Sequence, residues 1–385
     1  MRFADNRNKI GKYIPAVVFL IFIYGMALWF IFSPKPDYSS SEKRYLQKFP
    51  EVTAEKLLSG DFGSEFETFF ADRFPQRNTW VGLNAYTALA EGNNGASGVY
   101  NCKNGYLINK PVSTENNLDK NIGAVADFAK SIDTPTTVML VPSTGYIVDD
   151  VLPTFHDKYN DDEDISKISS TLSKDKIGFV DLRERFKSEY KNGSQLYYKT
   201  DHHWTTKGAY TGYQELCKAL GITPIDDSTL KKDSYPDFYG TTYSSSGFWL
   251  TPPDNIEIWN NSKNSDRNIS VKITEGANVK TSGSMYFTDH LKEDDKYPVF
   301  IDGNHALTEI TNTNAKNGTI LLIKDSFSHS LAPFLAENYS KVVLVDLRYY
   351  KESVSDLVTT YNPEQVVVLY GIDNLATDTD IVWLK

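Results

Sequence analysis

The 385-residue chain has little cysteine and no excess of positive charge. Its two cysteines, Cys102 and Cys217, are too few for a disulfide framework and lack the C-x-x-C spacing of a zinc site. A bridge between them is permitted outside the cell but is not required, and Cys217 falls in a predicted helix, where a small buried side chain is expected. The formal net charge of -10 argues against nucleic-acid binding, which usually needs a basic surface.

The sequence also has no internal repeat of fixed period, no long low-complexity segment, and only one run apolar enough to span a bilayer. That run, residues 14–32, contains no charged residue and approaches the ~20 residues that a spanning helix needs. The residues that follow it, beginning Ser33-Pro34-Lys35-Pro36, show no convincing Ala-x-Ala cleavage pattern, which favours a retained anchor over a signal peptide. The basic residues that precede it are Arg2, Arg7, Lys9 and Lys12.

Because basic residues stay on the cytoplasmic side, residues 1–13 are expected to remain in the cytoplasm and the rest to be exported. The Pro-, Ser- and Tyr-rich residues 33–41 predict a short tether. Charged and aromatic residues recur at helical spacing in residues 42–74, which predicts a helical entry region. The sequence therefore predicts a single-pass cell-membrane protein whose one large domain, residues 42–385, lies outside the cytoplasm.

Short apolar strands alternate with amphipathic helices through most of this domain, which predicts a doubly wound, mostly parallel sheet with its site at the carboxyl ends of the strands. A stretch rich in Ser, Asn and Tyr, residues 231–317, breaks the rhythm and predicts an antiparallel β insertion. The predicted strands are 136–142, 177–182, 319–323, 341–345 and 365–370, and the predicted helices are 116–131, 165–172, 206–220, 330–337 and 349–359.

The segment Asp201-His202-His203-Trp204 precedes a predicted helix and holds two of the six histidines. An aspartate two residues before a histidine can fix the imidazole tautomer and support the imidazolium that forms during proton transfer. Polar packing at a helix start explains the segment equally well. A metal site is disfavoured, because adjacent histidines in an extended segment point to opposite faces and no further ligand at helical spacing completes a set.

A candidate nucleophile follows the apolar run 319–323, in the sequence Lys324-Asp325-Ser326-Phe327-Ser328. A serine in a strand-to-helix turn lies at the carboxyl edge of the sheet, where its own N–H and the helix N-terminus favour a developing oxyanion. An ordinary helix cap would use the same residue types.

Together these segments resemble the DHHW proteins and the alginate O-acetylation proteins of the SGNH hydrolase-like group. The Asp-His-His-Trp element is similar to their Asp-x-His-Trp signature, and Asp325-Ser326-Phe327-Ser328 is similar to their serine block, although Lys324 stands where the family commonly has glycine. The resemblance extends to the entry segment, Ser41–Leu46 and Asp72–Arg77. It implies an SGNH-hydrolase-like three-layer α/β/α fold and a triad of Ser326, His203 and Asp201.

Four further residues are weaker candidates for oxyanion or substrate contacts. Arg348 follows a predicted strand at the same edge, although an ion pair is the commoner explanation for such an arginine. Tyr370 and Asn374 follow the last strand, and Asn374 is a possible side-chain donor to the oxyanion. Asn304 lies in a small polar cluster that turn chemistry explains as well.

The resemblance implies acetyl transfer through an acyl-serine onto a cell-surface or exopolysaccharide, with a membrane-bound O-acyltransferase as partner. No cofactor and no metal are expected. Two other functions stay open: a carbohydrate acetylesterase with the same triad, and a non-catalytic glycan-binding scaffold. The sequence does not distinguish transfer from hydrolysis, because both begin with the same acyl-serine.

Overall fold

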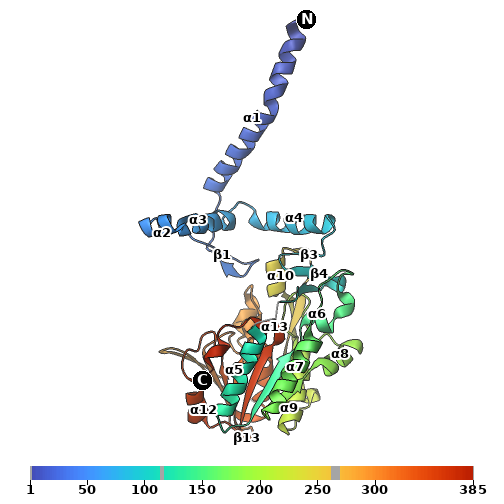
Figure 1. Cartoon of the computed structure of the whole chain (residues 1–385), viewed down its shortest axis with the longest axis vertical. Helices are drawn as coiled ribbons and strands as arrows, with labels where there is room; N and C mark the ends of the chain where they lie inside the picture. Colours follow the sequence, from blue (N-terminus) through green and yellow to red (C-terminus); the bar gives the residue numbers. More distant parts are fainter. Residues whose placement is uncertain (1, 113–116, 262–268, 385) are drawn as a thin grey trace. The chain divides into compact units, whose positions relative to one another are not determined.

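A computed structural model describes residues 2–112, 117–261 and 269–384 (Figure 1). Side chains are described from Lys12 onward, so Arg2, Arg7 and Lys9 of the predicted cytoplasmic segment lie outside the described side chains. The chain divides into two units, Met1–Thr87 and Ala88–Lys385.

The first unit begins with helix α1, Arg2–Phe32. Its part Lys12–Phe32 is long and apolar enough to cross a membrane and is not buried against the rest of the chain. This contains the predicted span, residues 14–32. An N-terminal signal sequence can also be long and apolar enough to meet this criterion, so retention of the helix stays a prediction.

After α1, the chain forms a hairpin of β1 (Tyr38–Ser39) and β2 (Arg44–Tyr45) and then helices α2 (Ala54–Ser59), α3 (Asp61–Asp72) and α4 (Arg77–Ala90). The predicted helical region is thus helical from Ala54 onward, whereas residues 42–53 are the hairpin and an irregular segment. Arg44 donates two hydrogen bonds to the Asp72 carboxylate, at 2.9 and 2.5 Å, and Arg73 donates to the Gln47 carbonyl at 3.1 Å. These bonds fix the hairpin to the end of α3.

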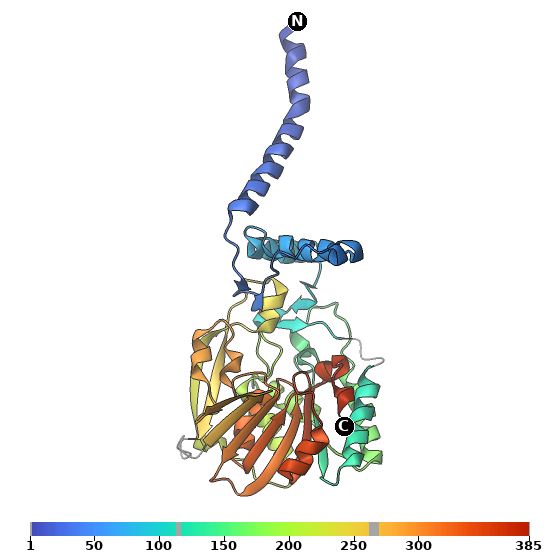
Figure 2. The same ribbon diagram turned by 90° about the vertical axis from the view of Figure 1, so that its left-hand side faces the viewer.

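The second unit contains an eight-stranded sheet in the order β11-β10-β12-β14-β13-β15-β6-β7 (Figure 2). The strands from β14 to β7 pair in parallel, and β12, β10 and β11 continue the sheet antiparallel. Their bounds are β6 Thr136–Val141, β7 Gly178–Asp181, β10 Ile269–Glu275, β11 Asn278–Ser282, β12 Leu307–Asn312, β13 Asn317–Lys324, β14 Tyr339–Val345 and β15 Gln365–Gly371.

The predicted insertion, residues 231–317, is antiparallel, but most of it does not form a separate layer. Strands β10, β11 and β12 extend the main sheet because β12 pairs with the edge of β14. Strands β8 (Leu230–Phe238) and β9 (Asp254–Asn261) form a separate two-stranded antiparallel sheet, and residues 262–268 lie outside the described residues. A three-stranded sheet of β3 (Gly95–Ala96), β4 (Val99–Asn101) and β5 (Leu107–Asn109) precedes the large sheet in the chain.

Helices cover both faces of the large sheet, because its central strands are apolar on both sides. In β13, Ile320 and Leu322 belong to one core cluster, whereas Leu321 and Ile323 belong to the other. Period-2 alternation sends successive side chains to opposite faces. The first cluster takes residues of α6 (Thr144–Ile147), α8 (Arg183–Lys191), α9 (Thr206–Leu220) and α11 (Ser328–Leu335), and the second takes residues of α5 (Asn117–Ser131), α7 (Asp161–Lys174), α12 (Val354–Tyr361) and α13 (Ile372–Thr377).

This arrangement confirms the predicted α/β/α fold with a mostly parallel sheet and antiparallel additions. The predicted helix at 116–131 is α5, although Asn116 lies outside the described residues. The predicted helix at 349–359 begins later, at Val354, where the Ser353 side chain accepts a hydrogen bond from the Asp356 N–H and caps it. Cys102 and Cys217 are both buried and unpaired, and Cys217 lies in α9 as predicted.

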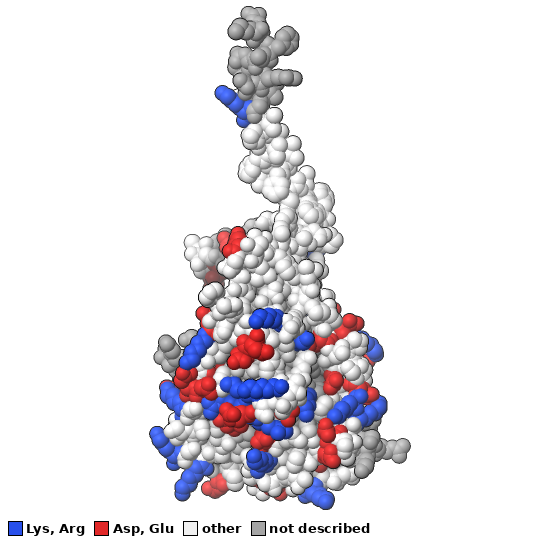
Figure 3. Space-filling view, turned by 90° about the vertical axis from the view of Figure 1, so that its right-hand side faces the viewer, with Lys and Arg blue, Asp and Glu red and all other residues white. Residues whose placement is uncertain are grey.

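The direction of the connections between strands reverses at β13. The chain runs from β13 through α11 to β14 on one side, and then through α12 to β15 on the other side of β13. The carboxyl end of β13 is therefore a topological switch point, where open α/β sheets leave room for a ligand. The surface of this unit carries Lys/Arg and Asp/Glu side by side, without one large region of a single sign on the face in view (Figure 3).

Candidate active site

Ser326 lies in the turn between β13 and α11 and is 8% exposed. The preceding residue, Asp325, holds this turn in place. One of its carboxylate oxygens accepts the Phe327 N–H at 2.9 Å, and the other accepts the Gly371 N–H and the Asn374 amide, both at 2.7 Å. The turn that carries the serine is thus tied to the neighbouring strand end, that of β15.

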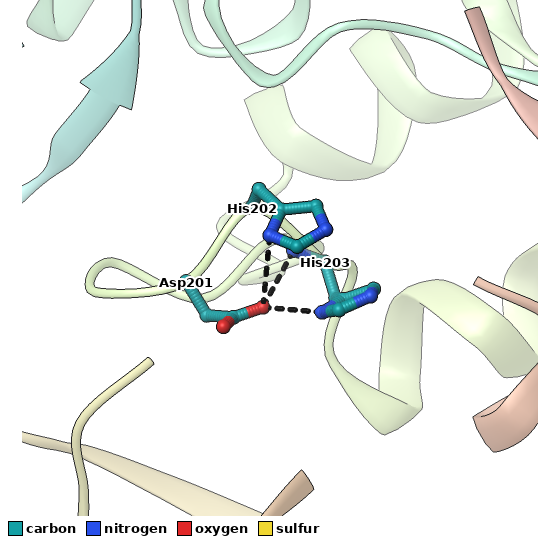
Figure 4. A group of neighbouring side chains, drawn as sticks. All are labelled: Asp201, His202 and His203. Atoms are coloured by element: carbon teal, nitrogen blue, oxygen red, sulfur yellow. Dashed lines mark hydrogen bonds and ion pairs between the residues drawn. The ribbon is translucent and has the colours of Figure 1, made fainter. Parts of the chain in front are cut away.

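Asp201 and His203 lie in a tight loop that is closed by a bridge between Tyr197 and Trp204. One carboxylate oxygen of Asp201 accepts both the His203 backbone N–H at 2.8 Å and the ring Nδ1–H at 2.5 Å (Figure 4). A proton on Nδ1 leaves Nε2 as the acceptor of the same imidazole. The carboxylate therefore selects the tautomer that a general base needs.

Folding brings this imidazole to the serine. The Ser326 Oγ lies 2.7 Å from His203 Nε2, although the two residues are 123 positions apart. Both side chains are buried, as is Asp201. Carboxylate, imidazole and hydroxyl thus form one hydrogen-bonded series in the order that a serine nucleophile requires.

The carboxylate of Asp201 is held on both of its oxygens. Its second oxygen accepts the N–H of Thr241 at 2.7 Å and the hydroxyl of the same residue at 3.1 Å, from the start of α10 (Thr241–Ser246). Burial opposes ionisation of Asp201, but the electrostatic effect of the neighbouring imidazoles of His203 and His202 and these hydrogen bonds prevail and hold its pKa well below the ordinary value. The carboxylate is therefore charged at neutral pH.

Gly240 allows this close approach. A Cβ at this position would lie 2.0 Å from the Asp201 Cβ and 2.3 Å from its carboxylate oxygen. A side chain of any size would push Asp201 away from His203. The glycine immediately before α10 is thus a steric requirement of the site.

Two further side chains hold the loop in position. The Trp204 indole N–H donates to the Phe327 carbonyl at 3.0 Å and to the Ser330 hydroxyl at 2.9 Å, which ties the histidine loop to the serine turn. Asp254, on β9, accepts the N–H groups of Lys199 and Thr200 at 2.9 and 2.8 Å. Trp204 is fully buried. Asp254 was not found by sequence reasoning.

Tyr297 is a contact that sequence reasoning missed. Its ring stacks on His203 with 3.9 Å between centroids and 9° between planes, and its hydroxyl donates to the Ser326 carbonyl at 3.2 Å. Phe327 meets the same imidazole edge-on at 5.1 Å. Tyr297 comes from the predicted insertion, and one tyrosine among 24 carries no sequence signal of its own.

The prediction that His202 and His203 point to opposite faces is wrong. Their ring centroids are 3.8 Å apart, because the segment bends here and is not extended. Donor atoms of Asp201, His202 and His203 lie within 4.8 Å of one another, a spacing compatible with an ion. The same atoms serve hydrogen bonds, since His203 Nδ1 bonds Asp201 and His202 Nδ1 lies 2.6 Å from the Thr241 hydroxyl. Burial and the charge of His203 lower the pKa of His202 to about 4, so this ring is neutral at neutral pH.

Three of the four weaker candidates, Arg348, Tyr370 and Asn374, line one pocket together with Asp325. The Asn374 amide donates to Asp325, next to the nucleophile. Arg348 forms two bonds with Asp346, at 2.8 and 2.6 Å, and donates to Asn304 at 2.9 Å. The ring of Tyr370 belongs to the apolar cluster beneath α5 and α13. Among the residues that the structure describes, no hydrogen bond or ring contact joins Arg348, Asn304 or Tyr370 to Ser326 or His203, and their proposed roles stay predictions.

Lys324, the departure from the family's glycine, is buried at the end of β13. Its ammonium lies 2.9 Å from the Asp346 carboxylate and 2.9 Å from His329 Nε2. Burial lowers the pKa of Lys324, and Asp346 opposes that effect. Where the family commonly has a glycine, this chain thus has a lysine that forms a buried ion pair next to the serine turn.

A pocket opens beside Asp201 and His202, at the carboxyl ends of β6 and β15. Asp161, the first residue of α7, fixes one wall by accepting the Ser143 N–H at 2.7 Å. Burial raises the pKa of Asp161 to about 7, the charge of Asp373 adds to this, and the Ser143 bond opposes it. Residues lining the pocket include Asn109, Ser143, Thr144, Tyr159, Thr242, Phe327, Gly371, Asp373 and Asn374.

A parallel α/β/α sheet with this serine, imidazole and carboxylate at its carboxyl edge places the chain among the SGNH-hydrolase-like proteins. The family model "DHHW protein" matches residues 106–345. The chain therefore belongs to the DHHW family. No curated protein matches it.

Solved structures share the fold at low sequence identity. A DHHW family protein from Eubacterium siraeum is 18% identical, with 75% of this chain and 95% of that chain covered and a TM-score of 0.62. PatB1 from Bacillus cereus, in a structure with a sulfonyl adduct, is 19% identical, with 74% and 97% covered and a TM-score of 0.61. The O-acetyltransferase domain of Pseudomonas putida AlgJ is 14% identical, with 75% and 95% covered and a TM-score of 0.48.

The first prediction concerns Gly240. In Gly240→Ala, the new Cβ displaces Asp201, the imidazole loses its fixed orientation, and Ser326 should react with a sulfonyl fluoride about 100-fold more slowly. Intact-protein mass spectrometry measures the rate of adduct formation. Gly123→Ala, at a helix position with no atom within 4 Å of the added Cβ, is the matched control and should react at the wild-type rate. Equal rates for Gly240→Ala and wild type would show that Asp201 does not govern the serine.

The second prediction concerns Asp161 and pH. The folded protein holds a proton at Asp161 up to about pH 7, whereas the unfolded chain releases it near the ordinary value of 3.8. Asp161 therefore contributes most to the free energy of unfolding below pH 3.8. This contribution falls as the pH rises towards 7, by at most about 1.4 kcal/mol per pH unit. In urea unfolding series, the decline should be smaller in Asp161→Asn than in wild type, because Asp373 and other buried carboxyls with raised pKa retain their share of it. Asp119→Asn, at an exposed position, should keep the full decline. The same decline in Asp161→Asn would contradict the assignment.

Proposed function

We propose that this chain is an extracytoplasmic serine acyltransferase that transfers acetyl groups to a cell-surface or exopolysaccharide. One observation carries the proposal: Ser326, His203 and Asp201 form a hydrogen-bonded series of 2.7 and 2.5 Å beside a pocket. The resemblance of the same residues to those of the alginate O-acetylation proteins supports transfer. The sulfonyl adduct recorded for PatB1 fits a fold that hosts a reactive nucleophile.

In the first half-reaction, the Ser326 hydroxyl gives its proton to His203 Nε2 as Oγ attacks the acyl carbonyl of the donor. The resulting imidazolium is stabilised by the charged Asp201. Collapse of the tetrahedral intermediate breaks the bond to the leaving group, which takes the proton from His203. The product is acyl-Ser326.

In the second half-reaction, a sugar hydroxyl gives its proton to His203 and attacks the acyl-serine carbonyl. The Ser326 oxygen leaves and takes the proton back, which restores the starting state. Because water can replace the sugar, the acceptor decides between transfer and hydrolysis. The pocket wall of Ser143, Asp373 and Asn109 offers polar groups suited to sugar hydroxyls.

The oxyanion of both intermediates needs donors that face the carbonyl oxygen. The Ser326 N–H, in the strand-to-helix turn, is one proposed donor. Asn374 is the second, since its amide nitrogen carries two hydrogens and Asp325 accepts one of them. The bond to Asp325 would orient the other.

The acyl donor is proposed to arrive through a membrane-bound O-acyltransferase. The apolar helix Lys12–Phe32 supports this, because an anchored enzyme stays near a membrane-embedded partner. The chain is accordingly proposed to remain in the cell membrane as a single-pass protein.

The third prediction is that full-length protein in detergent, given p-nitrophenyl acetate, forms an acetyl adduct on Ser326. Ser326→Ala should lose the adduct and should lower ester turnover by about 1000-fold or more. Ser328→Ala, which removes a buried hydroxyl two residues away, is the control and should keep both. Peptide mass spectrometry locates the acetyl group. A folded wild-type protein without an adduct would indicate a scaffold and would contradict the proposal.

The fourth prediction is that an oligosaccharide acceptor diverts the acetyl group from water to sugar. Acetylated oligosaccharide should accumulate with wild-type protein and Ser328→Ala, and not with Ser326→Ala. Mass spectrometry of the sugar and measurement of free acetate give the two product ratios. Free acetate as the sole product, across acceptors from several surface polysaccharides, would identify an esterase instead.

A further inference from the structure

The first unit has far more exposed apolar side chains than its length predicts. Within residues 49–70 there are six: Phe49, Val52, Leu57, Leu58, Phe66 and Phe70. The described residues from 88 to 384 have the same number in a stretch more than ten times as long: Val112, Phe155, Leu250, Val279, Tyr349 and Trp383. A concentration of this kind marks a surface that meets another apolar phase.

Several of these side chains belong to a cluster that is continuous with α1. Ring contacts connect Phe30 of α1 to Phe70 at 4.7 Å and to Phe69 at 6.2 Å, and Phe69 to Phe49 at 5.4 Å. Phe66 contacts Phe49, Phe62 and Phe69. The phenylalanine cluster is defined as Phe30, Phe49, Phe62, Phe66, Phe69 and Phe70.

The position of Phe30 sets the depth of this cluster. The 21 residues from Lys12 to Phe32 form a helix about 31 Å long, which equals the ~30 Å of a bilayer's hydrocarbon core. Phe30, two residues from the end of that stretch, then lies at the boundary between hydrocarbon and headgroups. Because Phe70 and Phe69 touch Phe30, α3 must lie at the same level.

The polar contacts of this region are consistent with α3 lying at the boundary between hydrocarbon and headgroups. Arg73 donates to the Lys35 carbonyl at 2.6 Å, which holds the chain just after α1 against the end of α3. Both α2 and α3 run across the end of α1 and do not continue its direction (Figures 1 and 2). A short amphipathic helix with this orientation lies in the plane of the interface.

The charges of the region indicate what kind of surface it meets. Residues 42–87 contain six basic and seven acidic residues, so no excess of positive charge attracts anionic lipid. The attraction must come from the apolar rings, which are suited to the headgroup level of any bilayer.

We infer that the phenylalanine cluster is immersed in the interface of the membrane that α1 crosses, so that α3 lies flat on the outer leaflet as a second, peripheral attachment. This inference rests on α1 being a retained span and is independent of the proposed chemistry. It commits to lipid as the occupant, since the cluster is a continuation of the apolar surface of α1.

The fifth prediction tests this contact in the full-length chain. Both native cysteines are buried, so a single cysteine introduced as Phe66→Cys can carry a fluorescent label. Leu250→Cys, at an exposed apolar position of the second unit, is the matched control. Each labelled protein is reconstituted in vesicles of neutral phosphatidylcholine.

Lipids with a nitroxide near the headgroup should quench the label at position 66 and not the label at position 250. Aqueous iodide should do the reverse, with a quenching constant several-fold lower at position 66. The same values are expected when a fifth of the lipid is anionic, because the contact is apolar. Vesicles without nitroxide lipid give the unquenched fluorescence of each label.

Two results would overturn the inference. Iodide quenching at position 66 equal to that at position 250 would show that α3 faces water. Protection from iodide without quenching by the lipid nitroxide would show that a protein surface, such as a second copy of the chain, covers the cluster. Ester turnover, measured on the same samples, reports on the proposed function separately.

Discussion

The hydrogen bond between His203 Nε2 and Ser326 Oγ is the contact on which the rest of the site depends. It joins two segments that have no local reason to meet, a tight loop and a strand-to-helix turn. Trp204 holds these segments together through the hydrogen bonds of its indole N–H to Phe327 and Ser330. The sheet provides the rest, because β13 fixes the position of the turn and every central residue of that strand is buried. A site assembled this way exists only in the folded chain.

The elements that the sequence predicted well are those whose pattern is local. The strands at 319–323 and 365–370 are continuous apolar runs, and the helix at 206–220 has a glycine at its end that adopts the left-handed conformation. The serine, histidine and aspartate were predicted as a triad from the resemblance to the DHHW and alginate O-acetylation proteins. Local periodicity and short spacing were not enough, because polar packing and an ordinary helix cap explained the two segments equally well.

What the sequence did not reveal depends on pairing between distant segments. Tyr297 stacks on His203 only because η6 (Tyr297–Val299) folds over the site, and Gly240 matters only because α10 meets Asp201. The orientation of His202 was mispredicted because a bend was mistaken for extended chain. The strands of the predicted insertion joined the large sheet because the free edge of β14 accepted β12, which no local pattern could indicate.

The buried Lys324, at the end of β13 and next to the serine turn, restricts which substitutions are compatible with folding. Lys324 and Asp346 form a buried ion pair at 2.9 Å, and the more exposed Arg348 binds the same carboxylate at 2.6 Å. Loss of Asp346 alone would leave the Lys324 ammonium buried without its carboxylate partner. Loss of Lys324 alone would leave Asp346 paired with Arg348, so Lys324 can be substituted first, whereas substitution of Asp346 requires that Lys324 has already been lost.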